Sequence, residues 1–273
     1  MKVYVLVDNK WAPGGPEGEH GLSLYLESGD AGILFDTGQG DRFSRNAEIL
    51  AVDLSKALMA VISHGHYDHG GGIEKFLEVN KNAIVYVHST AFEQHSSLKS
   101  DGSYADISLD PDLKDNPRII FSDVGASLGE WLTIFSGVEN KHPSSESNRN
   151  LFVGSGEDIR PDNFKHEQHL IVEEGERSFL IIGCSHSGIV NIVNKAKDIL
   201  GKFPDFVIGG FHLQIQLGNP EDLQHVRNIS KVLLSTGVRF YTCHCTDDSA
   251  YDLMKEAMGQ NIQMLKTGDI LEI

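Results

Sequence analysis

The stretch VISHGHYDHGGG (residues 61–72) places three histidines and one aspartate within six positions, directly after an apolar run. One residue separates His64 from His66, so both imidazoles can leave the end of a strand on the same side. Asp68 and His69 follow on the turn into the next helix, where one carboxylate and one imidazole can hold a second ion. Zn²⁺ prefers nitrogen, oxygen and sulfur ligands, and its catalytic sites keep three protein ligands plus a water. We therefore expect half of each of two neighbouring metal sites here rather than a solvated polar turn. The three glycines that follow permit a tight turn with close backbone approach.

The composition is that of a globular α/β protein with an acidic surface. The chain has 273 residues, 40% of them hydrophobic and 23% charged, with a formal net charge of −16. A chain of this length can form one large domain, and we expect a single domain over residues 1–273. Because nucleic-acid binding depends on clustered Lys and Arg, the charge argues against a nucleic-acid partner and against tRNA processing.

The sequence also indicates a location in the cell. The opening MKVYVLVDN is too short in apolar residues for a secretory signal, and no segment approaches the length of a membrane span. Three cysteines (Cys184, Cys243 and Cys245) cannot pair completely, which suits a reducing compartment. We expect a cytoplasmic protein with no membrane partner.

Short β-branched runs alternate with helical periods along most of the chain. The expected strands are residues 2–8, 22–26, 32–36, 58–63, 83–88, 169–174, 178–183, 205–210 and 238–243. The expected helices are residues 72–79, 187–201, 221–237 and 247–259. Two stretches, 96–116 and 139–163, are polar and without clear periodicity, and we interpret them as loop insertions over the mouth of a site.

Histidines recur at the ends of these expected strands. Strands ending at Ser63, Gly183, Gly210 and Cys243 are each followed within three residues by a histidine. Such a recurrence predicts that the strand ends present their side chains to one edge of the fold. The candidates added in this way are His186, His212 and His244.

The motif HGHYDH (64–69) looks like the signature of the metallo-β-lactamase fold superfamily. The upstream ILFDTG is similar to that superfamily's strand-end aspartate, which would make Asp36 a support beneath the metal loop. Further segments are EHGLSLYLE (19–27), HEQHLIV (166–172), GCSHSGIVN (183–191), GGFHL (209–213) and CHCT (243–246). Together they resemble the branch containing the dihydropterin–ribofuranosylaminobenzene phosphate synthases and many metal-dependent hydrolases. Two departures from the branch are His166, where an acidic residue is usual, and Asp247, where glycine is usual.

The resemblance implies an αββα sandwich of two mixed sheets flanked by helices, and it implies ligands for two ions. Cys184 takes the bridging position, although a small buried hydrophobe is the alternative reading. His186 is the more conservative ligand, and His244 takes the place of the last one. His212 is either a ligand or a group that polarises the substrate.

The remaining assignments concern the neighbours of these ligands. Glu167 is a candidate general acid or base, or a carboxylate that holds a ligand imidazole, with an exposed surface glutamate as the alternative. Asp68 is a candidate catalytic residue as well as a ligand. Cys243 and Cys245 are expected to pack on the face opposite His244. His20 and His142 lie in loops that could line a pocket.

Two divalent ions about 3.5–4 Å apart can bridge a hydroxide or activate a leaving group. We expect a dinuclear hydrolase or transferase acting on a small anionic, phosphorylated or pterin-like substrate. Zinc is the first choice of metal, with manganese, magnesium and iron as alternatives. The alternative functions are a di-iron redox member of the fold and a non-catalytic metal- or ligand-binding regulatory protein. Assembly is left open, a homo-oligomer included.

Overall fold

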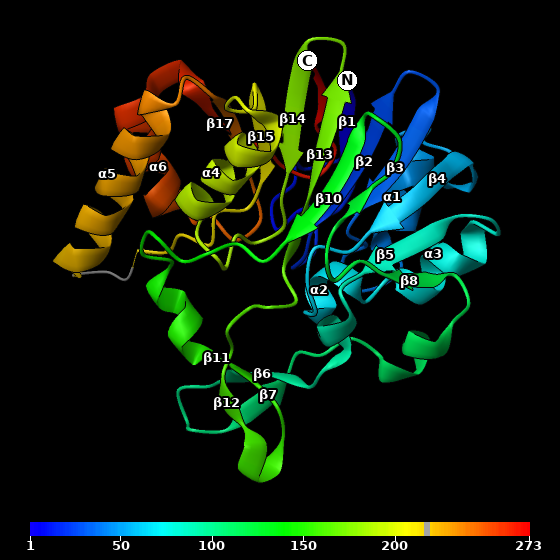
Figure 1. Ribbon diagram of the computed structural model, residues 1–273, viewed down its shortest axis with the longest axis horizontal. Helices are drawn as coiled ribbons and strands as arrows, with labels where there is room; N and C mark the ends of the chain where they lie inside the picture. Colours follow the sequence, from blue (N-terminus) through cyan, green and yellow to red (C-terminus); the bar gives the residue numbers. More distant parts are fainter. Residues whose placement is uncertain (216–218) are drawn as a thin grey trace.

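The computed structural model describes residues 1–215 and 219–273, which form two stacked seven-stranded sheets (Figure 1). The first sheet, in spatial order, contains β18 (Ile270–Glu272), β1 (Lys2–Val7), β2 (Ser23–Ser28), β3 (Ala31–Phe35), β4 (Ala57–Val61), β5 (Ile84–Val87) and β8 (Ile119–Phe121). The second contains β17 (Ile262–Met264), β16 (Arg239–Thr242), β15 (Phe206–Gly209), β14 (Arg177–Ile181), β13 (Gln168–Glu174), β10 (Leu132–Ser136) and β9 (Ala126–Ser127). Each sheet has parallel and antiparallel neighbours, so both are mixed as expected.

Helices cover the outer face of each sheet. They are α1 (Arg42–Ile49), α3 (Ile73–Val79), α4 (Ile189–Leu200), α5 (Pro220–Ser235) and α6 (Asp248–Met258), whereas α2 (Tyr67–Gly70) is a single turn in the loop after β4. Figure 1 shows α4, α5 and α6 on the side of the second sheet, and α1 and α3 on the side of the first. The fold is the predicted αββα sandwich.

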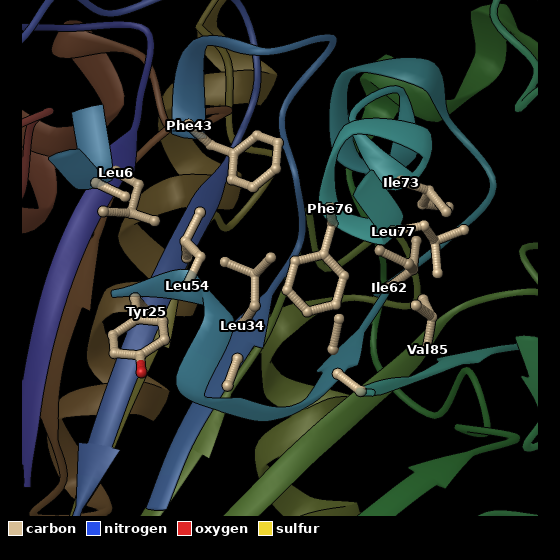
Figure 2. Close-up of a cluster of buried hydrophobic side chains, with 14 of the residues drawn as sticks. Leu6, Tyr25, Leu34, Phe43, Leu54, Ile62, Ile73, Phe76, Leu77 and Val85 are labelled. Atoms are coloured by element: carbon tan, nitrogen blue, oxygen red, sulfur yellow. The ribbon is translucent and has the colours of Figure 1, made fainter. Parts of the chain in front are cut away.

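Three hydrophobic clusters hold these four layers together. The central cluster lies between the sheets, where Phe35 of β3 and Ile181 of β14 are completely buried. Figure 2 shows an outer cluster, in which Phe43 of α1 and Phe76 of α3 pack over the first sheet. Burying an aromatic side chain of this kind contributes about 1.5–3 kcal/mol, so each layer has its own stabilising contacts.

The periodic segments form the elements that their patterns predict. In α4, Ile189, Ile192, Val193 and Ala196 share the buried face, and the helix ends at Gly201, whose φ of 73° is left-handed. Helix α1 was missed because its sequence, RFSRNAEI, carries few apolar residues.

The two polar stretches are not structureless, and that part of the prediction is wrong. They form a third, antiparallel sheet of β12 (Arg160–Pro161), β11 (Leu151–Val153), β6 (His95–Leu98) and β7 (Tyr104–Asp106). Its strands are only two to four residues long, and β6 pairs with β11 from the other stretch, which hides it from local sequence patterns. Figure 1 shows this sheet below the sandwich, on the side away from the chain termini. We call it the cap.

Within the described residues, the structure has no helix with both the length and the apolar character that a membrane crossing requires.

Candidate metal centre

The site lies where β3, β4, β14, β15 and β16 end. Parallel strands deliver their carboxyl ends to one edge of a sheet, and polar side chains on the following turns meet there. Asp36, Ser185, His212 and His244 take left-handed backbone conformations on these turns, with φ between 50° and 66°. Such conformations are costly for residues other than glycine and concentrate at functional sites.

The glycines after His69 allow the metal loop to lie against the sandwich. A Cβ atom on Gly72 would lie 2.4 Å from the carbonyl oxygens of Thr37 and Gly40, a distance that no side chain tolerates. The predicted close backbone approach is therefore confirmed.

Three imidazoles form what we call the first half-site: those of His64, His66 and His186. His64 Nε2 lies 3.0 Å from His66 Nδ1, and one nitrogen of each of the three rings lies within 4.8 Å of the others. His64 Nδ1 contacts Ser63 Oγ at 2.9 Å, and His186 Nδ1 contacts Asn148 Oδ1 at 2.9 Å. These outer contacts place the ring protons on Nδ1, so the lone pairs at Nε2 face the centre of the group.

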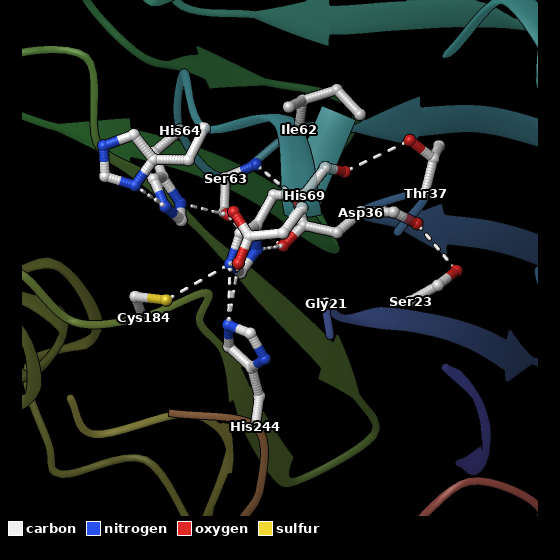
Figure 3. Close-up of polar contacts among 12 residues, drawn as sticks. Gly21, Ser23, Asp36, Thr37, Ile62, Ser63, His64, His69, Cys184 and His244 are labelled. Atoms are coloured by element: carbon white, nitrogen blue, oxygen red, sulfur yellow. Dashed lines mark hydrogen bonds and ion pairs between the residues drawn. The ribbon is translucent and has the colours of Figure 1, made fainter. Parts of the chain in front are cut away.

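The second half-site consists of Asp68, His69, Cys184 and His244, and Figure 3 shows the last three side chains converging. His69 Nε2 lies 3.1 Å from His244 Nε2 and 3.2 Å from Cys184 Sγ. Asp68 Oδ2 lies 3.4 Å from the same His244 nitrogen. One oxygen, one sulfur and two nitrogens therefore converge, and this donor set suits a divalent transition metal.

The Asp36 carboxylate orients the His69 ring of the second half-site through its outer nitrogen, Nδ1. His69 Nδ1 donates to Asp36 Oδ2 at 2.7 Å, and Asp36 also accepts hydrogen bonds from the amide and the hydroxyl of Ser63 (Figure 3). Asp36 thus lies beneath the metal loop, as the sequence indicated. His244 Nδ1 contacts Asn9 Oδ1 at 2.9 Å.

The two half-sites differ in charge. Burial lowers the pKa of His64, His66 and His186 well below the usual value, so these three rings are neutral at pH 7. Burial also opposes the charged form of His244, but the Asp68 carboxylate and its neighbours outweigh it and raise the pKa of His244 to about 9. Neutral imidazoles are ready to bind a cation, whereas His244 must first lose a proton.

Cys184 is buried within the site, and burial raises the pKa of its thiol well above the usual value. Cys245 lies beside it, which corrects the prediction that Cys245 packs away from His244. Strand β16 ends at Thr242, so side chains no longer alternate beyond it, and Cys245 lines the pocket. Cys243 is fully buried between the sheets, as expected.

Glu167 has a different role from either one predicted for it. It is buried rather than exposed, and its carboxylate accepts hydrogen bonds from the backbone amides of His186 (2.6 Å) and Ser187 (2.8 Å). Among the described contacts it holds no ligand imidazole, and it is not one of the residues that line the pocket. Its effect is to fix the loop that carries His186.

His212 lies at the wall of the site, 4.3 Å from the His186 ring between centroids. One of its nitrogens lies within 4.8 Å of donor atoms of Cys184 and His186. Its position suits both predicted roles. His20 Nε2 lies 3.2 Å from Asp68 Oδ2, whereas His142 is not part of the described pocket lining.

A pocket of about 690 Å³ opens over both half-sites. Its wall includes Ser97, Lys99, Ala105 and Ile107 from the first polar stretch and Ser147, Asn150 and Leu151 from the second. The prediction that these stretches cover the site is confirmed. The volume is in the usual range for small-molecule sites.

Several contributors had no signal in the sequence. Asn9 and Asn148 are isolated amides in irregular segments, and only the folded chain brings them to the imidazoles. His95 and Asp162 form, with His166, a buried group beside His66.

The sequence model of the Metallo-beta-lactamase superfamily matches residues 17–197. The chain belongs to the metallo-β-lactamase superfamily. All the ligand candidates of the metal loop (64–69), together with Cys184 and His186, fall inside the matched residues, and His244 follows them in the chain.

The chain is also similar to individual proteins over most or all of its length. It is 26% identical to the 7,8-dihydropterin-6-methyl-4-(beta-D-ribofuranosyl)-aminobenzene-5'-phosphate synthase of Methanocaldococcus jannaschii, over 100% of this chain and 96% of that protein. An uncharacterised protein of the same organism is 30% identical over 71% of this chain and 73% of its own length. The crystal structure of Tm1679, a metal-dependent hydrolase of the beta-lactamase superfamily, is 31% identical with a TM-score of 0.80, covering 100% and 99% of the two chains.

Proposed function

We propose that this metallo-β-lactamase superfamily member is a dinuclear metal-dependent hydrolase or transferase acting on a small anionic, phosphorylated or pterin-like substrate. The observation that carries the proposal is the convergence of seven donor residues, from turns far apart in the sequence, beside one pocket that five of them line. The seven are His64, His66, Asp68, His69, Cys184, His186 and His244.

The donor set fits two divalent ions, with zinc as the first choice. His186 Nε2 is buried and has no hydrogen-bond partner among the described residues, which is costly unless a cation occupies its lone pair. Two such ions polarise a phosphoryl or carbonyl oxygen and activate a water or a leaving group. The chain itself orients the imidazoles through Ser63, Asp36, Asn9 and Asn148.

Two observations support an anionic substrate. Lys99 adds positive charge to the pocket wall although the whole chain is acidic, and Lys10 lies on the same wall in an ion pair with Asp248. The similarity to the M. jannaschii synthase extends over the whole chain and favours a phosphorylated or pterin-like molecule. His212 and His20, beside the two half-sites, are the side chains placed to contact such a substrate.

The proposal extends to location and partners. The free, buried cysteines suit a reducing cytoplasm, and a small-molecule pocket makes neither nucleic acid nor membrane the expected partner. A homo-oligomer is compatible with this proposal.

Metal analysis of the purified protein, followed by substrate screening, tests the proposal. We expect about two equivalents of divalent metal, and turnover of a phosphodiester, a phosphomonoester or a pterin pyrophosphate that stops after chelation and returns with zinc or manganese. Redox turnover with bound iron would favour the di-iron alternative. Two bound ions with no turnover of any substrate would favour the regulatory alternative.

A further inference from the structure

A second buried polar group lies directly behind His66, between the metal loop and the cap. His95 begins β6, Asp162 follows β12 and His166 precedes β13. One nitrogen of each of His66, His95 and His166 and one Asp162 oxygen lie within 4.8 Å of one another. The side chains of His95 and Asp162 are 0% and 1% exposed, so water does not solvate them.

The hydrogen bonds of this group determine where its protons lie. The Gly65 amide donates to His166 Nδ1 at 2.8 Å, so the proton of His166 is on Nε2, which donates to Asp162 Oδ2 at 3.1 Å. His95 Nδ1 donates to the same oxygen at 3.0 Å. His95 Nε2 consequently carries a lone pair, and it is buried with no partner in the described part of the chain.

His66 supplies the complementary group. Its Nδ1 lies 3.0 Å from His64 Nε2, on the side of the first half-site. An imidazole that binds an ion through Nδ1 carries its proton on Nε2, and His66 Nε2 is also buried without a partner among the residues described. The centroids of the His66 and His95 rings are 5.6 Å apart, with an angle of 77° between the ring planes. The two Nε2 atoms are a donor and an acceptor on neighbouring rings, and in the described structure neither forms a hydrogen bond, with the other or with a third group.

His66 differs from the other ligand candidates in this respect. His64, His69, His186 and His244 each have an outer oxygen on Nδ1 within 2.9 Å. An outer partner orients a ligand imidazole and strengthens its bond to the ion. Among the five, His66 alone has no such oxygen in the described structure.

We propose that His95 and Asp162 are positioning residues: when an ion occupies the first half-site, His95 Nε2 accepts a hydrogen bond from His66 Nε2, and Asp162 orients His95 through its Nδ1, so that His66 Nδ1 is held toward the ion. This inference rests on the metal centre of the proposed function but not on its substrate. Gly65 makes the arrangement possible, because a Cβ atom there would lie 2.7 Å from His95 Nε2 and 2.5 Å from the Ala91 carbonyl oxygen. Because His95 lies in the cap strand β6 and Asp162 directly follows the cap strand β12, the cap takes part in metal binding as well as in forming the pocket wall.

The same four residues could instead hold a third ion. Hydrogen bonding argues against it, because both nitrogens of His166 and the Oδ2 atom of Asp162 already have partners. A third ion would have to break these contacts. We therefore favour positioning, and the experiment below separates the two.

Cobalt titration of the metal-stripped full chain tests the inference with paired variants. His95→Leu removes the acceptor, whereas His95→Gln keeps an amide that can donate to Asp162 and accept from His66. We expect His95→Leu to lower the cobalt affinity of the first half-site by about 10- to 100-fold. The cobalt affinity of His95→Gln should stay within about threefold of that of the unmodified chain. The Cys184 thiolate band, which belongs to the second half-site, should stay unchanged in both variants.

His88→Gln is the matched control, because His88 is also a buried histidine beside an aspartate, Asp123, but lies outside both half-sites. Thermal unfolding establishes that each variant is folded. If His95→Leu does not fold, Asp162→Asn replaces it, with an expected weakening of about three- to tenfold.

Unchanged cobalt affinity in a folded His95→Leu protein would overturn the inference while leaving the proposed function intact. Three bound ions in the unmodified chain, one of them lost in His95→Leu, would also overturn it in favour of a third site. Failure of the unmodified chain to bind any metal would instead contradict the proposed function.

Discussion

The two half-sites are built from different chemistry although they share one pocket. The first consists of three neutral imidazoles, and its outer contacts are a hydroxyl, an amide and, by our inference, a histidine of the cap. The second combines a carboxylate, a thiol and two imidazoles over a fully buried aspartate, Asp36.

The difference indicates how the two ions should behave. Negative charge at the second half-site favours a cation, so we expect tighter binding there once its protons are lost. The first half-site needs no proton loss but has less charge. The ion of the first half-site should therefore exchange more readily, and its affinity should depend on the cap residue His95.

The largest expected effect comes from removing one metal ligand from each half-site in turn. His66→Ala should release the ion of the first half-site alone, and His69→Ala the ion of the second. Either should lower any hydrolytic activity by roughly a thousandfold, equivalent to about 4 kcal/mol of transition-state stabilisation. Metal analysis and kcat/KM measure both effects. Full metal content with unchanged turnover in His66→Ala would contradict the dinuclear proposal.

Lowering the pH should weaken metal binding at the second half-site and leave metal binding at the first half-site unchanged. His244, with a pKa of about 9, holds a proton in the metal-free chain below that pH, and the ion must displace it. Affinity there should fall about tenfold per pH unit below 9, so by about a hundredfold at pH 7. The three imidazoles of the first half-site, whose pKa values burial lowers, should give no such slope between pH 7 and 9.

Chelator competition between pH 7 and 9.5 measures both slopes. A slope of about two at the second half-site would show that the Cys184 thiol, whose pKa burial raises, also loses its proton to the ion. Equal slopes at the two half-sites would contradict the comparison.

The outer hydrogen bonds should contribute more to metal affinity at the second half-site than at the first. Asp36→Asn should lower the metal affinity of the second half-site by about 10- to 100-fold, because His69 loses a charged partner. Asn148→Ala, which removes the neutral partner of His186, should cost about tenfold at the first half-site. Asp53→Asn, on the exposed surface, is the control. A greater loss in Asn148→Ala than in Asp36→Asn would reverse the expected order.

Cys184→Ser tests whether sulfur belongs to the second half-site. If the thiolate binds the ion, the serine variant should lose the sulfur charge-transfer band of the cobalt protein and bind that ion about tenfold more weakly. The first half-site should be unaffected. Absence of the band in the unmodified cobalt protein would assign Cys184 to packing.

The smallest effect should come from the rim of the cap, which touches neither half-site. Lys99→Ala, or shortening of residues 100–103 at the β6–β7 turn, should raise KM for an anionic substrate about three- to tenfold, a loss of roughly 1 kcal/mol. Metal content and thermal stability should hold as long as His95 remains. An unchanged KM for every substrate tested would show that the rim of the cap does not contribute to substrate binding.

The local part of the fold was predictable because it depends on local patterns. Alternating β-branched runs and helical periods predicted β1 to β5 and β13 to β16, and they also predicted α3 to α6. The prediction missed strands β8, β9, β10, β17 and β18, which are two to five residues long. It also missed helix α1, where Asn46 is buried by hydrogen bonds to Leu6 and Glu17, and the cap strands, where β6 finds its partner some fifty residues away. Neither cause leaves a periodic signal.

The sequence by itself determined which residues gather at the centre. His64, His66, Asp68 and His69 are held within one turn, and strand-end histidines reach the same edge because parallel strands share a direction. Only the tertiary structure decided the outer contacts: Glu167 on backbone amides, Cys245 inside the pocket, Asn9 and Asn148 on imidazoles, and His95 with Asp162 behind His66. The physical reason is that a hydrogen bond between distant segments depends on distance and direction in space, which close packing determines and local spacing does not.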